Sequence, residues 1–152
     1  MSTGQLATFC VLLLLCGSIP AAQSNWVPLG QSSLGKWQIY IESNSVHTDA
    51  NGYVSVLVLD DYRVTQTGVD FVDSSGHMFR DEEHRYRSSV TRYLLDCAKR
   101  RERMLQMRYY AGDMGTGALV LLENETDPIW TDLLFDLEKN LVRFACSRKN
   151  PQ

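Results

Sequence analysis

The first 24 residues contain no charged side chain, although charged residues make up 22% of the whole chain. An apolar run from Phe9 to Cys16 lies in this segment. It is shorter than the roughly 20 residues that a membrane-spanning helix needs. Small residues, Ala22 and Ser24, then occupy the −3 and −1 positions of a cut before Asn25. This layout predicts a signal peptide over residues 1–24 and an exported mature domain over residues 25–152.

No Lys or Arg precedes the apolar run, and only the amino terminus supplies positive charge there. A retained anchor is therefore an alternative to cleavage. Cys16 could also carry a lipid, but Leu15 stands where a lipoprotein signal has a small residue. We expect an exported protein of the periplasm, outer membrane or cell surface, whose link to a membrane would be a lipid on Cys16.

Patterns typical of enzymes and cofactor sites are missing from the sequence. The three histidines, His47, His77 and His84, are scattered and form no pair at metal-ligand spacing. Ser88-Ser89 lacks the G-x-S-x-G context of a nucleophile elbow. The glycine-rich segment 111–117, AGDMGTG, lacks the Gly-Lys-Ser/Thr of a phosphate loop and instead predicts a hairpin turn. We therefore expect no catalytic, metal or cofactor site.

Cysteine is scarce, with only Cys97 and Cys146 outside the leader. An exported domain with two cysteines most simply forms one disulfide. Such a bridge would close a loop of about 50 residues and stabilise the fold by ~4 kcal/mol in the chain-entropy model.

Alternation of apolar and polar residues predicts five strands, over residues 36–43, 53–64, 86–97, 101–110 and 117–124. Asn51-Gly52 predicts a tight turn before the second of these. Residues 25–34 are predicted as a lead-in, and residues 65–85 as a long loop or a short irregular hairpin. Apolar residues then recur at helical spacing over 131–146, with Thr131 as the expected N-cap. Strands followed by one terminal helix indicate an α+β fold.

Nine of the fifteen Lys and Arg residues fall between Arg80 and Arg108. The net charge of −3 by itself predicts no nucleic-acid or membrane partner. Antiparallel pairing would bring several of the basic residues to one end of the sheet, where they could bind acidic glycans or matrix proteins. The alternative is a solvated face of mixed charge, in which nearby acids such as Asp81, Asp96 and Glu102 pair with them.

Several segments in a fixed order resemble the bacterial surface-adhesin protein E family. They are YRSSVTRYLLDC (86–97), AKRRERMLQMRYY (98–110), GDMGTG (112–117), Trp130 and a terminal helix ending in FAC (144–146). The upstream strand patterns are similar to the family as well, so that the resemblance covers roughly residues 36–147.

The resemblance implies a curved antiparallel sheet of about five or six strands, with the C-terminal helix tethered to one face by the disulfide. It also implies a non-enzymatic protein of the bacterial cell envelope that adheres to extracellular-matrix or serum proteins such as vitronectin and laminin. The residues matching the family's binding segment are His84, Arg85, Arg87, Arg92, Lys99, Arg100, Arg101 and Arg103. Alternatives are a small-ligand carrier, for example of haem with a histidine ligand, and a structural envelope protein of unknown ligand.

Overall fold

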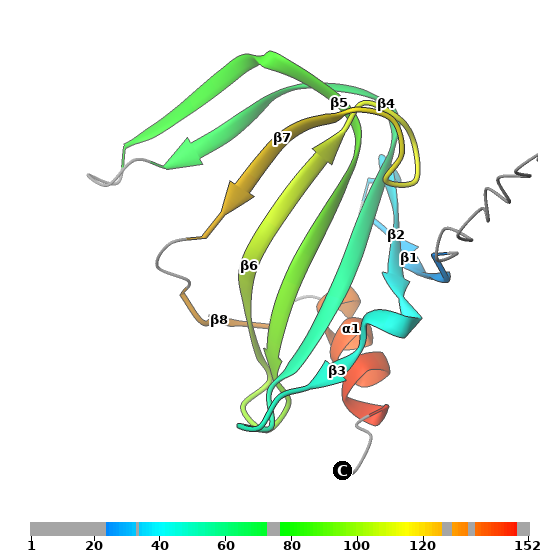
Figure 1. Cartoon of the computed structure of the whole chain (residues 1–152), viewed down its shortest axis with the longest axis vertical. Coiled ribbons are helices and arrows are strands. Elements are labelled where there is room, and N and C mark those ends of the chain that lie inside the picture. Colours follow the sequence, from blue (N-terminus) through cyan, green and yellow to red (C-terminus); the bar gives the residue numbers. More distant parts are fainter. Residues whose placement is uncertain (1–23, 33, 73–76, 126–128, 134–135, 149–152) are drawn as a thin grey trace, which may run out of the picture.

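The computed structural model describes residues 24–32, 34–72, 77–125, 129–133 and 136–148. The predicted signal peptide, apart from Ser24, and the Cys16 alternative lie outside these residues. Within them, eight strands form one antiparallel sheet and one helix follows at the C-terminal end (Figure 1). No helix in the described ranges is long and apolar enough to span a membrane.

Six strands pair in the order β1-β2-β4-β5-β6-β7, and two strands of two residues each join at the side. Their bounds are β1 Trp26–Gln31, β2 Trp37–Glu42, β3 His47–Thr48, β4 Val54–Val72, β5 Met78–Asp96, β6 Arg101–Tyr110, β7 Leu119–Asn124 and β8 Thr131–Asp132. The predicted antiparallel α+β architecture and its five strands are confirmed. β4 lies between β2 and β5, and Leu59 on its second face is fully buried because Gly115 of the segment that connects β6 to β7 lies over it.

The lead-in prediction for residues 25–34 was wrong, because β1 forms there and pairs with β2. Val27 and Leu29 pack against the hydrophobic core, and this burial stabilises the segment as a strand. Pro28 is compatible with this assignment because β1 is the edge strand of the sheet.

Of the two alternatives predicted for residues 65–85, the loop is wrong and the irregular hairpin is right in kind but too short, because β4 and β5 continue through most of this segment as one long hairpin. Their register is interrupted between Asp61 and Gln66 and again between Thr67 and Val69. The outer arms of the hairpin bend away from the rest of the sheet (Figure 1). Polar residues such as Thr65, Thr67 and Asp70 are exposed, so this part of the sequence lacks the apolar alternation that predicts a strand.

Segment 111–118 connects β6 to β7, which confirms the predicted hairpin turn. It folds back onto the sheet: Ser88 Oγ donates to the Gly112 carbonyl at 2.6 Å and accepts from the Gly115 N–H at 2.9 Å. Gly115 has φ +70°, and a Cβ there would lie 3.2 Å from Val90. The positive φ favours glycine here, and a Cβ would also make a tight contact with the Val90 side chain of β5.

The C-terminal helix α1 (Asp136–Ser147) packs on one face of the curved sheet. Its buried residues Leu141, Val142 and Ala145 join a core with Ile39, Ile41, Val54, Val56, Val58 and Leu95. The helical spacing of apolar residues predicts Leu141 and Ala145 on the buried side of the helix, with Val142 on a stripe beside them, and the structure confirms this.

Thr131 is not the N-cap of the helix, contrary to the sequence prediction. Thr131 and Asp132 form β8, which pairs with Glu102 and Arg101 of β6. The Leu133 N–H then donates to the Arg100 carbonyl at 3.2 Å. Pairing satisfies backbone groups of β6 at an edge that β7 does not reach, which explains why a strand forms there.

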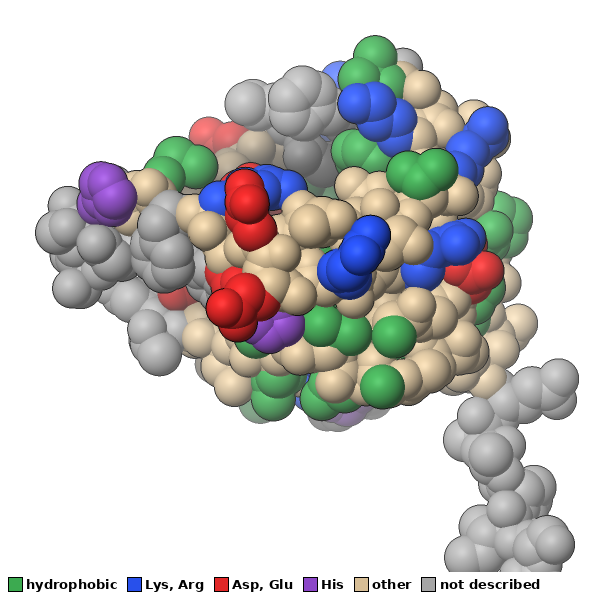
Figure 2. Space-filling view, turned by 90° about the horizontal axis from the view of Figure 1, so that it is seen from above, with side chains coloured by type: hydrophobic (Ala, Val, Ile, Leu, Met, Phe, Trp, Pro, Cys, Tyr) green, Lys and Arg blue, Asp and Glu red, His purple; other side chains and the backbone are tan. Residues whose placement is uncertain are grey.

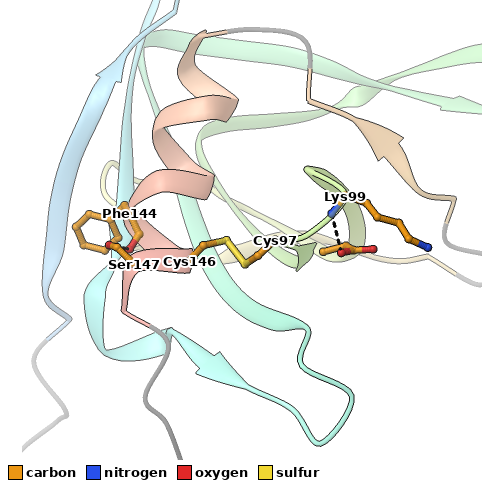
Figure 3. Close-up of a disulfide and its surroundings, with 6 residues drawn as sticks. Cys97, Lys99, Phe144, Cys146 and Ser147 are labelled. Carbon is orange, nitrogen blue, oxygen red and sulfur yellow. Dashed lines mark hydrogen bonds between the residues drawn. A yellow bond between two sulfur atoms is a disulfide. The ribbon is translucent and has the colours of Figure 1, made fainter.

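Cys97 and Cys146 form the predicted disulfide, which joins the end of β5 to the last turn of α1 (Figure 3). Their Cα atoms are 5.9 Å apart, and the bridge spans 49 positions of sequence. Both cysteines also pack against the core. The bridge therefore fixes the helix at the same end of the sheet as the β5–β6 turn.

Replacing both cysteines by serine should lower the free energy of unfolding by about 3–4 kcal/mol, because the open chain gains loop entropy. Urea denaturation of the oxidised wild type and of the Cys97→Ser/Cys146→Ser variant measures the difference. Wild type reduced with dithiothreitol is the matched control and should resemble the variant. An unchanged unfolding midpoint in both samples would contradict the prediction.

Candidate functional site

The two faces of the sheet carry different chemistry. We call the face covered by α1 the inner face and the opposite one the outer face. Tyr93 and Leu95 pack with α1 on the inner face, so Arg92 and Leu94 lie on the outer face. This alternation along β5 is the one predicted from the sequence.

A β-bulge places further arginines on the outer face. Arg103 is paired with Leu94, and Arg108 is paired with Val90, so both share the outer face. Their separation by five positions would put them on opposite faces of a regular strand. Leu105 is the extra residue of the bulge, between the pairs of Met104 and Gln106. Sequence reasoning missed Arg108 as a site residue because nothing in the pattern signals the bulge.

The turn after Cys97 is held by Asp96. The Asp96 carboxylate accepts from the Lys99 N–H at 3.1 Å and from the Arg101 guanidinium at 3.0 Å. Burial alone would raise the pKa of Asp96, but these two hydrogen bonds and the neighbouring positive charges together lower it. The Lys99 and Arg100 side chains are exposed in this turn, where Arg100 adopts a φ of 53°.

Trp130 holds two of the arginines. The guanidinium carbons of Arg101 and Arg103 each lie 5.0 Å from the centre of its ring. Tyr53 packs on the same ring with a centroid distance of 5.2 Å. Such cation–π contacts contribute about 0.5–2 kcal/mol each, so that Trp130 restricts both arginine side chains.

The other predicted binding residues lie elsewhere. His84, Arg85 and Arg87 are in the part of β5 that bends away, far along the strand from the disulfide. His84 Nδ1 is 2.9 Å from Asp81, and Arg87 is 2.9 Å from Asp113. Figure 2, which looks down on this end of the molecule, shows acidic and basic side chains interspersed.

The structure therefore divides the eight predicted residues into two groups. One group, toward the disulfide end, contains Arg92, Lys99, Arg100, Arg101 and Arg103, and the bulge places Arg108 on the same face further along β6, opposite Val90. Among them, Arg92, Lys99 and Arg100 are exposed and make no ion pair with another residue of the described ranges. We call these three residues together with Arg101, Arg103 and Arg108 the basic surface.

The inner face holds a pocket of about 190 Å³ between the sheet and α1. Its apolar lining comes from Leu29, Trp37, Ile39, Val58 and Leu141. Its polar lining comes from Tyr93, Asp60 and Glu102. Burial raises the pKa of Asp60 from 3.8 to about 7.

A row of aromatic rings crosses the sheet beside the pocket. Trp37 contacts Tyr62 at 5.5 Å between ring centres, Tyr62 contacts Tyr86 at 5.5 Å, and Tyr86 contacts Tyr109 at 4.8 Å. The Tyr109 hydroxyl donates to Glu123 at 2.8 Å. Burial, together with neighbouring acids, raises the pKa values of Tyr62 and Tyr109, so both phenols stay protonated at neutral pH.

None of the three histidines lines this pocket in the described part of the chain. His47 is exposed in β3, His77 is exposed before β5, and His84 contacts Asp81. The pocket is also smaller than the roughly 300–1,000 Å³ typical of sites for drug-sized ligands. Neither observation favours the haem-carrier alternative.

The family model for surface-adhesin protein E matches residues 26–147. Among solved structures, crystal form II of Haemophilus influenzae protein E is similar with a TM-score of 0.54 and 17% sequence identity. That alignment covers 84% of this chain and 91% of the other. Protein E from non-typeable H. influenzae gives a TM-score of 0.54 at 17% identity, over 84% of this chain and 79% of the other. No curated protein matches the sequence.

The stability of the protein should depend on pH through Asp60. Because its pKa is 3.8 in the unfolded reference and about 7 in the fold, the folded protein binds more protons between these values. The free energy of unfolding therefore falls as the pH rises from about 4 to about 7. One pKa unit corresponds to about 1.4 kcal/mol, so the loss should reach a few kcal/mol.

Asp60→Asn removes this titration, and its stability relative to wild type should increase across the same interval. Chemical denaturation at a series of pH values measures the difference. Asp70→Asn is the control, because that carboxylate is exposed in the bent arm. Parallel profiles for wild type and Asp60→Asn would show that the buried acid does not titrate in this range.

Proposed function

Because this chain belongs to the surface-adhesin protein E family, we propose that it is a non-enzymatic surface protein that binds acidic macromolecules through the basic surface. The proposal rests on Arg92, Lys99 and Arg100, which are exposed and form no ion pair within the described ranges, beside two arginines that contact Trp130. Suitable partners are sulfated glycans and acidic segments of extracellular-matrix or serum proteins, with vitronectin as the partner that the family resemblance implies.

Preorganisation supports this surface as a binding site. Asp96 fixes the turn, the disulfide fixes its base, and Trp130 holds Arg101 and Arg103. Binding would then immobilise fewer flexible side chains, and each immobilised side chain otherwise costs about 0.5–1.5 kcal/mol. Planar guanidinium groups also suit bidentate contacts to sulfate or carboxylate.

The bent arm is the weaker candidate for the same role. Its residues Arg80, His84 and Arg87 contact Asp70, Asp81 and Asp113, respectively. Those carboxylates neutralise most of the positive charge there, and a partner would have to displace them. Arg85 is exposed and makes no ion pair within the described ranges, but it is isolated from the basic surface.

Replacing Arg92, Lys99 and Arg100 together by glutamate should weaken binding to heparin and to vitronectin by about tenfold or more. Three surface charge contacts contribute roughly 0.2–1 kcal/mol each, and their reversal adds repulsion. Surface plasmon resonance, or the salt concentration that elutes the protein from heparin, measures the change.

The matched control is Lys36→Glu/Arg63→Glu/Arg143→Glu, which changes the net charge equally at three other exposed positions. It should bind almost as wild type does. Equal loss in both triple variants would indicate an effect of net charge alone. Undiminished binding in the first variant, or no binding by wild type, would reject the proposed surface.

A further inference from the structure

The pocket on the inner face has features of a binding site that the proposed adhesive function does not use. It lies between α1 and the sheet, on the face opposite the basic surface. Its lining residues come from five strands, β1, β2, β4, β5 and β6, and from α1. The pocket is therefore formed only in the complete fold. Its volume of about 190 Å³ limits the occupant to a small molecule.

The polar lining of the pocket is acidic. Asp60 comes from β4 and Glu102 from β6, while no Lys, Arg or His is among the described residues that line it. The Asp60 carboxyl makes no hydrogen bond or ion pair with another residue of the described ranges. A carboxylate in such surroundings is destabilised unless a cation or a proton neutralises it.

The other lining residues of the pocket are apolar, so they would suit the hydrocarbon part of a ligand that carries a positive charge. Leu29, Ile39, Val58 and Leu141 supply aliphatic contacts, and Trp37 supplies an aromatic ring. Trp37 also begins the row of rings that continues through Tyr62. Ammonium groups are attracted to the faces of aromatic rings, most strongly to tryptophan.

We propose that the inner-face pocket binds a small organic amine, with its ammonium group at Asp60 and its apolar part between Trp37 and α1. Glu102 also lines this pocket. An uncharged molecule of the same shape would leave the Asp60 carboxylate without a partner and should bind more weakly. The proposal does not depend on the adhesive function, because the two sites lie on different faces.

Benzylamine is a suitable probe, and benzyl alcohol is its uncharged counterpart. Isothermal titration at pH 8 should show benzylamine binding at least about tenfold more tightly than benzyl alcohol, the factor that corresponds to one ionic contact of about 1.4 kcal/mol. Asp60→Asn should reduce benzylamine binding by a similar factor. Asp70→Asn should leave it unchanged, and heparin binding should be the same for all three proteins.

Lowering the pH from 8 to 5.5 should weaken benzylamine binding to wild type, because Asp60 takes up a proton in this interval. The other titratable groups that line the pocket are Glu102 of β6 and Tyr93 of β5. The charge of Asp60 also acts on Tyr62 of β4 and Tyr86 of β5. The raised pKa values of Tyr62 and Tyr86 keep both phenols neutral throughout. The described lining residues of α1, β1 and β2 are apolar or aromatic.

Nuclear magnetic resonance of wild type provides a second measurement in case Asp60→Asn does not fold. Benzylamine should shift the amide signals of Asp60, Val58 and Trp37 and the indole signal of Trp37. Equal binding of benzylamine and benzyl alcohol would identify the pocket as merely apolar and overturn the proposal. Shifts confined to other residues, or no binding at millimolar probe, would overturn it as well.

Discussion

The packing of α1 against one face of the sheet is the interaction on which the other features depend. Ile41, Val54 and Leu95, all fully buried, meet the helix there, and the Cys97–Cys146 bridge keeps it in place. Once one face is covered, strand alternation and the pairing register assign every other side chain to a face. The basic surface and the acidic pocket are therefore two results of one packing arrangement.

Only some of the basic residues of this protein are available to bind a partner, because others pair with carboxylates of the same chain. Arg80, Arg87 and Arg101 are paired with carboxylates and help to define the bent arm and the turn. Arg92, Lys99 and Arg100 carry no such partner within the described ranges. The same sequence cluster thus divides into residues that hold the fold and residues that remain exposed to solvent.

Sequence reasoning identified the elements whose pattern reflects burial on one side. The alternation of β2, β5 and most of β4, the spacing of Leu141 and Ala145, and the cysteine pair all follow from packing on one face. β1 was missed because Pro28 and Gly30 are unfavourable inside a strand, and the bent arm because most of its described side chains are exposed to solvent. In the sequence, Asp60 and Asp61 are simply two adjacent acids, and only the three-dimensional register shows that Asp60 lines the pocket while Asp61 accepts from the Met114 N–H.

The bulge at Leu105 has a consequence for how this fold can vary between species. Because it shifts the face of every later position in β6, removal of one residue there would move Arg108 to the helix side and Tyr109 to the outside. Replacement of Leu105 by another residue would leave both assignments intact. At this position natural selection should therefore act on the length of the chain more strongly than on the identity of the side chain.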